Sequence, residues 1–192
     1  MPELIAIYDS CVLYPAPLRD FLVRLALTGL FRARWTDAIH DEWIRNVLEN
    51  RPDLSASQLE RTRQLMNAAV RDCLVTGYEW RIDSLTLPDP DDCHVLATAL
   101  EAQAQVIVTY NLRDFPADAL QPHGIEAQHP DEFILRVIAL SPLVVRETVE
   151  THQQALKNPP KTPAEYLATL SNQGLPKTVA ALSQICFKSE RG

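Results

Sequence analysis

Three acidic residues in this chain occupy positions from which carboxylates could do chemistry together. Asp9 directly follows the apolar run 4–8. Glu42 lies in an amphipathic segment, and Asp92 stands at the expected start of a helix. Because the carboxyl ends of parallel strands meet at one edge of a sheet, such residues can converge despite their distance in sequence. Clustered carboxylates repel one another unless a cation lies among them, and an all-oxygen ligand set suits Mg²⁺ or Mn²⁺ rather than zinc. The pattern therefore predicts a divalent-cation site suited to phosphodiester hydrolysis.

The segment 87–115, LPDPDDCHVLATALEAQAQVIVTYNLRDF, is the part around which the rest of the chain is organised. Asp89 suits a helix cap, and Pro90 suits the first helical position, where a missing N–H costs nothing. Asp92 lies three and four residues before Val95 and Leu96, so its side chain points along the apolar stripe. The run 106–108 then suits a buried strand, and the polar residues 109–114 follow at its carboxyl end, where open α/β sheets bind ligands.

Each acid also has a purely structural explanation. Asp9 could cap the turn that follows its strand, and Glu42 could pair with Arg45 or Asn46 on a helix surface. Any acid in the first turn of a helix is favoured by the helix dipole, and this effect alone could explain Asp92. The neighbouring acids Asp89 and Asp91 are expected to serve only as cap and surface residues.

Strands and helices alternate up to about residue 140, and only helices follow. Apolar runs predict strands at 4–8, 31–35, 106–108 and 124–128, with a weaker candidate near 82–85. Helical spacing predicts helices over 18–30, from Thr36 or Asp37, after the Ser55 capping box, after Asp89, and from Pro130 to about Leu140. Later helices are expected from Pro142, Pro163 and Pro176, the last running to Phe187. We therefore predict an α/β domain at 1–140, with a central parallel sheet flanked by helices, and a helical C-terminal extension at 141–192.

Composition places limits on this protein's surroundings. A hydrophobic content of 46% is ample for a packed core. The chain has no apolar run long enough for a membrane span and no basic region before its first apolar segment, so we expect neither a membrane anchor nor a signal peptide. Four scattered cysteines without a C-x-x-C pair read as reduced thiols of a cytoplasmic protein. The three tryptophans, Trp35, Trp43 and Trp80, are expected in the core.

The formal net charge of −7 argues against broad electrostatic attraction to nucleic acid. The basic residues are nevertheless unevenly placed, because ten of the 14 arginines lie between Arg19 and Arg81. Arginine forms forked contacts with phosphate, which leaves room for a local basic rim around an acidic pocket.

Four segments, taken in order, resemble the successive motifs of PIN domains, and the resemblance covers about residues 3–140. The segments are Asp9-Ser10-Cys11, Glu42-Trp43 with Val47-Leu48 after it, 92–99 (DCHVLATA) and 108–115 (VTYNLRDF). Bacterial members of this type are mostly VapC-like toxins of toxin–antitoxin pairs.

The resemblance implies an endoribonuclease that depends on Mg²⁺, or on Mn²⁺ in its place, and that acts on RNA. It also implies a protein that is often a homodimer and is held inactive by a cognate antitoxin. By position, Asp9, Glu42 and Asp92 would be the metal-binding and catalytic acids. Thr109 would lie near the substrate phosphate or a metal-bound water.

One position departs from the family pattern. The fourth acidic position commonly lies two residues after the threonine, and here it is Asn111. Either the site works with fewer carboxylates, with Asn111 beside the substrate, or Asp114 supplies the missing catalytic charge. The role of the residues after Leu140 is not revealed by the resemblance.

Two other functions compete with this one. Phosphatases that use an aspartyl nucleophile need a second Asp two residues after the first, and Cys11 at that position counts against them. The chain could instead be a PIN-like fold that has lost activity and binds RNA or protein, with Asn111 as the first sign of that loss. A metal-binding and RNA-cleavage assay separates this inactive binding module from an active ribonuclease.

Overall fold

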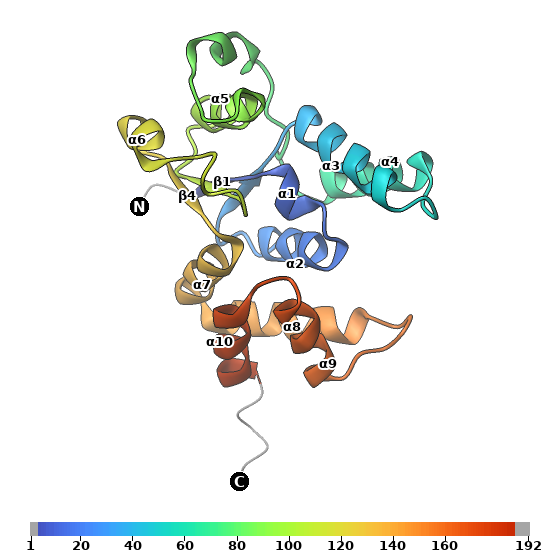
Figure 1. Ribbon diagram of the computed structural model, residues 1–192. Coiled ribbons are helices and arrows are strands. Elements are labelled where there is room, and N and C mark those ends of the chain that lie inside the picture. Colours follow the sequence, from blue (N-terminus) through green and yellow to red (C-terminus); the bar gives the residue numbers. More distant parts are fainter. Residues whose placement is uncertain (1–3, 187–192) are drawn as a thin grey trace. The chain divides into compact units, whose positions relative to one another are not determined.

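The computed structural model describes residues 4–186, which form two compact units (Figure 1). Within the described residues, the first unit comprises 4–14 and 31–129, and the second comprises 15–30 and 130–186. The segment 15–30 therefore belongs with the C-terminal helices rather than with the strands around it in sequence. The sequence predicts a domain boundary at residue 140, between a domain that folds by itself and a helical extension. That boundary stays a prediction.

The first unit is built on a four-stranded parallel sheet in the order β2-β1-β3-β4. The strands are β1 (Ile5–Tyr8), β2 (Arg32–Arg34), β3 (Val106–Val108) and β4 (Glu126–Gln128). The central strands β1 and β3 are the apolar ones, as expected for strands covered on both faces. The α/β class with a central parallel sheet is confirmed, and 124–128 does supply an edge strand.

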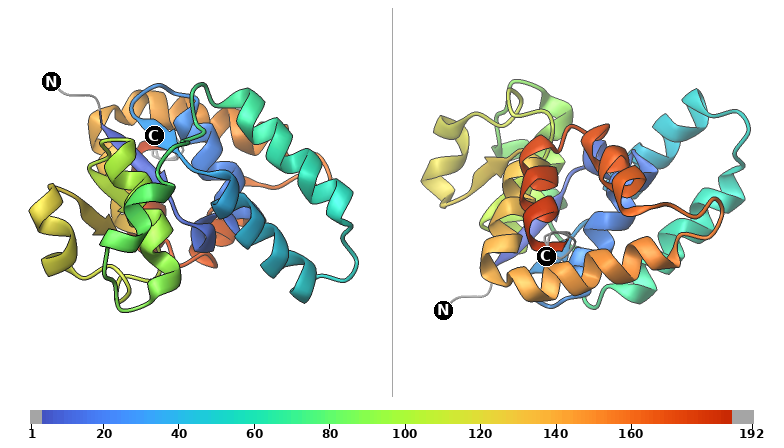
Figure 2. Two further views of the ribbon diagram at one scale, coloured as in Figure 1. Left: turned by 90° about the horizontal axis from the view of Figure 1, so that it is seen from above. Right: turned by 90° about the horizontal axis from the view of Figure 1, so that it is seen from below.

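The helices of the first unit begin where side chains can cap them. They are α1 (Ser10–Leu13), α3 (Asp37–Asn50), α4 (Ala56–Ala69), α5 (Cys93–Glu101) and α6 (Ala117–Leu120), with short 3-10 helices η1 (Glu79–Ser84), η2 (Pro90–Asp92) and η3 (Gln121–His123). The Thr36 side chain accepts from Ile39 N at 3.1 Å to start α3, and the predicted capping box of Ser55 and Gln58 starts α4. Helix α5 packs on β1 and β3 (Figure 2).

Two expectations for the segment 79–85 are wrong. No strand forms near 82–85, where the 3-10 helix η1 lies instead and Leu85 N donates to Ile82 O at 3.0 Å. Apolar residues three apart suit a 3-10 turn as well as a ragged strand, which explains the error. Trp80 is 70% exposed, whereas Trp35 and Trp43 are in the core as expected. The Arg81 guanidinium lies 4.3 Å from the Trp80 ring centroid and is held by Glu101.

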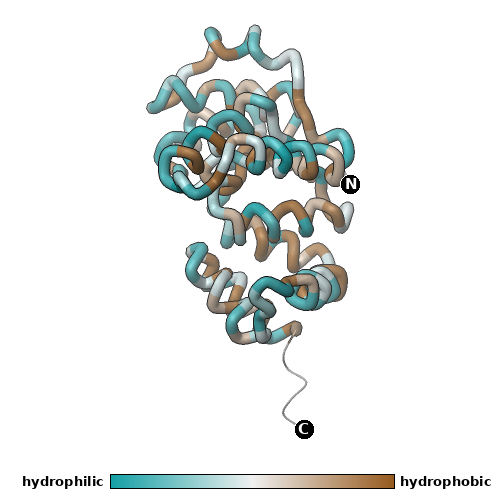
Figure 3. Tube along the Cα trace, turned by 90° about the vertical axis from the view of Figure 1, so that its right-hand side faces the viewer, coloured by the Kyte–Doolittle hydropathy of each residue, from teal (hydrophilic) through white to brown (hydrophobic). Residues whose placement is uncertain are grey.

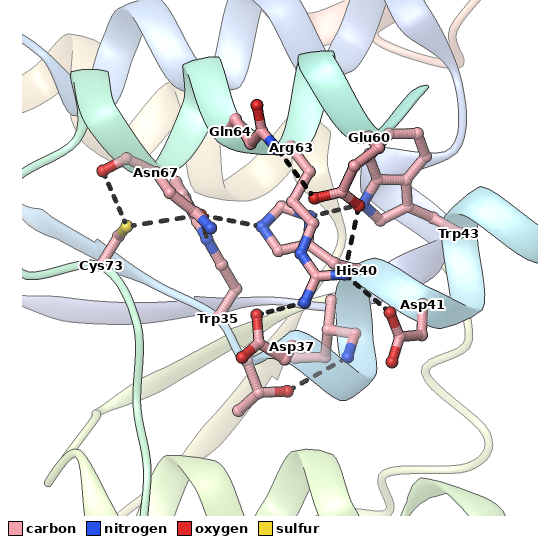
Figure 4. Close-up of polar contacts among 12 residues, drawn as sticks. Trp35, Asp37, His40, Asp41, Trp43, Glu60, Arg63, Gln64, Asn67 and Cys73 are labelled. Carbon is pink, nitrogen blue, oxygen red and sulfur yellow. Dashed lines mark hydrogen bonds and ion pairs between the residues drawn. The ribbon is translucent and has the colours of Figure 1, made fainter. Parts of the chain in front are cut away.

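A polar network joins α3 to α4 through Asn67 (Figure 4). Its Oδ1 accepts from Trp35 Nε1 at 2.8 Å and lies 2.9 Å from His40 Nε2. Trp43 Nε1 donates to His40 Nδ1 at 2.9 Å, so the proton of the neutral imidazole belongs on Nε2. Burial lowers the pKa of His40, which keeps the ring neutral and this donor–acceptor chain intact. One amide oxygen thus satisfies the ring donors of two buried residues.

We expect Asn67→Ala to lower the free energy of unfolding by about 2 kcal/mol, because it leaves the Trp35 and His40 donors without an acceptor. Urea denaturation measures this change. Gln64→Ala is the control on the same helix, since the Gln64 amide reaches only Glu60, at 3.4 Å on the exposed surface. That control should stay within about 0.5 kcal/mol of the unchanged chain. Equal decreases in the free energy of unfolding in the two variants would show that the hydrogen bonds to Asn67 do not stabilise the fold.

The second unit contains only helices: α2 (Ala16–Ala26), α7 (Pro130–Leu140), α8 (Pro142–Ala155), α9 (Pro163–Ser171) and α10 (Pro176–Cys186). Hydrophilic and hydrophobic residues alternate in short blocks along the helices (Figure 3). Helix α10 contacts α7, α8 and α9, and α2 packs against α8 and α9. The predicted helix starts at 142, 163 and 176 are confirmed, while the predicted end at Phe187 lies outside the described residues.

A polar relay, in which His152 and Tyr166 are buried and Asp20 is exposed, fixes α2 to the C-terminal helices of this unit. His152 Nε2 lies 2.7 Å from Asp20 Oδ2, and His152 Nδ1 lies 2.9 Å from Tyr166 Oη. Both buried members of the relay thus have hydrogen-bond partners, and Asp20 also pairs with Arg24 at 3.4 Å. Within residues 4–186, no helix is both long enough and apolar enough to cross a membrane.

Candidate active site

Asp9 is a buried carboxylate held by three donors at the end of β1. Its own N–H donates to Val108 O at 3.1 Å, which continues the pairing with β3. Oδ1 accepts from Ser10 N at 2.7 Å, so Asp9 does cap α1. Oδ2 accepts from Thr109 Oγ1 at 2.7 Å and from Cys11 Sγ at 3.1 Å. The carboxylate of Asp9, 2% exposed, therefore has one fixed orientation.

The surroundings of Asp9 disfavour the negative charge of its carboxylate. Burial raises its pKa, the hydrogen bonds from Thr109 and Cys11 lower it, and the charge of Glu42 raises it again, for a net increase. Burial and the nearby Asp9 charge likewise raise the pKa of the Cys11 thiol well above its usual value. Cys11 thus keeps its proton and acts as a donor to Asp9.

Thr109 stands at the end of β3, the strand beside β1. Its N–H donates to Gln128 O at 3.0 Å, and its hydroxyl accepts from Asn111 N at 2.9 Å while donating to Asp9. Adjacent parallel strands thus bring Asp9 and Thr109 together at one edge of the sheet, as the sequence indicated.

Glu42 projects from α3 and meets side chains from two other elements. Ser10 Oγ donates to Glu42 Oε1 at 2.7 Å, and His94 Nε2 lies 3.5 Å from Glu42 Oε2. The contact with His94 is the main reason that the pKa of Glu42 is lowered; burial opposes this effect, and the Ser10 hydrogen bond adds to it. The alternative pairing with Arg45 or Asn46 is not what orients this carboxylate, although the Arg45 charge does lower its pKa slightly.

Asp92 ends η2 and precedes α5 without a hydrogen bond from its side chain to the helix start. Asp89 is the residue that caps, accepting from Asp91 N at 3.0 Å. Burial is the largest of the effects that raise the pKa of Asp92 to about 7, and the charges of four other carboxylates contribute in the order Asp9, Asp114, Asp89 and Glu42. Capping therefore does not account for Asp92, which lies within electrostatic reach of the other predicted acids.

The two candidates for the fourth position differ in placement. Asp114 is partly buried, and its charge acts on Asp92. Asn111 has an exposed side chain, and its backbone carbonyl accepts from Asp114 N at 3.0 Å. The charge of Asp114 thus acts on Asp92, and which of the two residues fills the fourth position stays a prediction.

Comparison with known proteins identifies the family. The PIN domain model matches residues 6–113, more than half of the chain. The chain belongs to the PIN domain family. A second model, the VapC50 C-terminal domain, matches residues 130–184, which lie in the second unit.

One curated relative is the Putative ribonuclease VapC50 of Mycobacterium tuberculosis (strain ATCC 25618 / H37Rv), 43% identical over 82 residues. The matched part is 43% of this chain and 48% of the relative, so the match spans about half of that protein's length. No solved structure matches. The resemblance of the sequence to VapC-like PIN proteins with a C-terminal extension is confirmed.

Two residues of this PIN site were missed by sequence reasoning, namely Ser10 and His94, which contact Glu42. The available signal was their position, directly after Asp9 and two residues after Asp92. Sequence spacing alone does not show which side chain each of them reaches.

The donor set of the PIN site fits a hard divalent cation. Its charged groups are carboxylates, and burial together with mutual repulsion raises the pKa of Asp92, a cost that a cation relieves. Within residues 4–186, however, no three His, Cys, Asp or Glu side chains stand close enough together to hold a metal ion as they are. Mg²⁺ commonly uses one or two carboxylates and completes its shell with water and substrate phosphate, so an open set of acids agrees with its chemistry.

Proposed function

We propose that this chain is a Mg²⁺- or Mn²⁺-dependent endoribonuclease that hydrolyses RNA phosphodiester bonds. The observation that carries the proposal is that predicted acids from separate segments lie within electrostatic reach: the charges of Asp9, Asp114 and Glu42 raise the pKa of Asp92, and the charge of Glu42 raises that of Asp9. Ser10, which follows Asp9, also donates directly to Glu42 Oε1. Membership of the PIN family and the relative named a ribonuclease support RNA as the substrate.

The chain's own residues prepare this chemistry by fixing carboxylates before any ligand arrives. Asp9, Glu42 and Asp92 would hold the cation, which, when bound, supplies an activated water and neutralises charge on the phosphoryl group. Thr109 uses both its proton and a lone pair within the protein, so its role is to orient Asp9. Fixed carboxylates cost no reorganisation when the transition state forms.

Incubation of the full chain with single-stranded RNA in Mg²⁺, in Mn²⁺ and in EDTA tests this function. We expect internal cleavage with either cation and none in EDTA, with activity restored by excess Mg²⁺. Cleavage that persists in EDTA would contradict the metal dependence. RNA binding without cleavage under all conditions would favour the alternative, a weakened PIN-like binding module, for which Asn111 at the usual position of the fourth acid is the motivating observation.

We further propose that the protein is a cytoplasmic toxin of a type II pair, a homodimer restrained by a cognate antitoxin. Its cysteines are free thiols in the described residues, in agreement with a reducing compartment. Expression of the chain should arrest growth of a bacterial host, and co-expression of a small neighbouring reading frame should relieve the arrest. Size-exclusion chromatography with light scattering tests the dimer.

A further inference from the structure

Glu42 is placed differently from the other acids. Asp9 follows a strand and Asp92 precedes a helix that packs on the sheet, so the backbone largely sets where their carboxylates lie. Glu42 instead reaches out from α3 on a long side chain that is 30% exposed. Such a side chain has several rotamers in water and must be held if it is to act as a ligand.

Two side chains hold it, one on each carboxylate oxygen. The hydroxyl of Ser10 donates to Oε1 at 2.7 Å, and the imidazole of His94 faces Oε2 with Nε2 at 3.5 Å. Ser10 directly follows Asp9, and His94 comes two residues after Asp92. The pair therefore connects Glu42 to the segments that carry the other two acids.

The contact with Glu42 is the polar contact that the partly buried imidazole of His94 makes. The side chain is only 18% exposed, and its Nδ1 is buried without a hydrogen-bond partner in the described part of the chain. A buried polar atom without a partner is costly in a native protein and calls for an explanation. Because no acceptor or donor holds the ring from behind, the contact with Glu42 is what orients it.

We propose that Ser10 and His94 are positioning residues that hold the Glu42 carboxylate in the place where it binds the divalent cation. We name this pair the Glu42 clamp; its role rests on the function proposed above. Partners of metal-binding carboxylates act in this way in other proteins, and their loss weakens metal affinity by about 10- to 100-fold. The clamp also explains how an acid on α3 can act together with Asp9, which follows a strand, and Asp92, which precedes another helix.

A matched pair of substitutions tests His94 in the full chain. His94→Gln keeps an N–H donor near the place of the imidazole Nε2, whereas His94→Phe keeps a ring and removes the donor. Calorimetry with Mn²⁺ and no RNA should show about 10-fold weaker binding in His94→Phe and affinity close to that of the unchanged chain in His94→Gln. The melting temperature in EDTA should not fall in His94→Phe, because that change also removes the buried Nδ1.

A double-mutant cycle with Glu42→Gln shows whether His94 acts through Glu42. If it does, His94→Phe weakens Mn²⁺ binding no further once Glu42 has lost its charge. At saturating Mn²⁺, cleavage by His94→Phe should return toward that of the unchanged chain. A deficit that persists at saturation would mean that His94 contacts RNA, which overturns the clamp.

Other outcomes also overturn it: unchanged or tighter Mn²⁺ binding in His94→Phe, equal losses with and without the Glu42 charge, or no Mn²⁺ binding by the unchanged chain. Failure of the proposed function looks different. An unchanged chain that binds Mn²⁺ through the clamp and cleaves no RNA would refute the ribonuclease activity alone. Ser10→Ala and Ser10→Thr form the corresponding pair at Oε1, with rescue expected in Ser10→Thr because it keeps the hydroxyl.

Discussion

Asp9→Asn and Asp92→Asn are each expected to reduce RNA cleavage by about 10²-fold or more, the scale of losing one preorganised electrostatic group. Both substitutions keep size and shape and remove the charge that a cation would bind. Burial and neighbouring carboxylates raise the pKa of Asp92 to about 7, so a neutral amide should be tolerated there without metal. Cleavage of labelled RNA and melting in EDTA measure the two effects.

Asp89→Asn is the matched control for these variants. Asp89 is exposed and accepts from Asp91 N at 3.0 Å, and Asn caps a helix about as well as Asp. We expect the control to keep most of its cleavage and its Mn²⁺ affinity. Near-normal cleavage in Asp9→Asn or Asp92→Asn would show that the substituted residue has a structural role and not a catalytic one.

Much of the first unit could be predicted because local sequence and fold agree. The apolar runs at 4–8 and 106–108 suit buried strands, and the parallel pairing of these two strands then brings Asp9 and Thr109 together. Thr36 and Ser55 stand where caps are needed, so the starts of α3 and α4 followed from single residues.

Other features depend on contacts that no local pattern contains. Helix α2 has an apolar stripe and lies between two strands in the sequence, yet it belongs to the second unit, where Asp20 meets His152. The four-residue helix α1 is too short to leave a periodic signal. Trp80 was placed in the core on residue type alone, whereas its position on a short 3-10 helix leaves it exposed.

The same distinction applies to the candidate site. Residue type and order indicated Asp9, Glu42 and Asp92, because carboxylates after strands and at helix starts are recognisable. The contacts of Glu42 with Ser10 and His94 join three elements, and a helix surface and a binding site can have the same composition. Side-chain direction, not residue type, decides which of these roles a helical acid has.

The second large effect is expected on stability, at Asp131. This residue of α7 is 4% exposed and caps the start of another helix, α10. Its Oδ1 accepts from Thr178 N at 2.7 Å, and its Oδ2 accepts from Lys177 N at 3.0 Å. Leu175, which precedes α10, has no side-chain acceptor to offer, so the carboxylate of Asp131 accepts from two backbone donors at the helix start, of which that of Thr178 is buried.

Asp131→Ala should therefore lower the free energy of unfolding of the second unit by about 3 kcal/mol, from two lost hydrogen bonds to a charged acceptor and a lost interaction with the helix dipole. Denaturation followed by circular dichroism gives the change, and amide exchange at Lys177 and Thr178 localises it to α10. Glu132→Ala is the control, because the ion pair of Glu132 with Lys177 is exposed and should be worth less than about 1 kcal/mol. If Asp131→Ala loses no more stability than Glu132→Ala, α10 is held by packing against α7, α8 and α9 rather than by this cap.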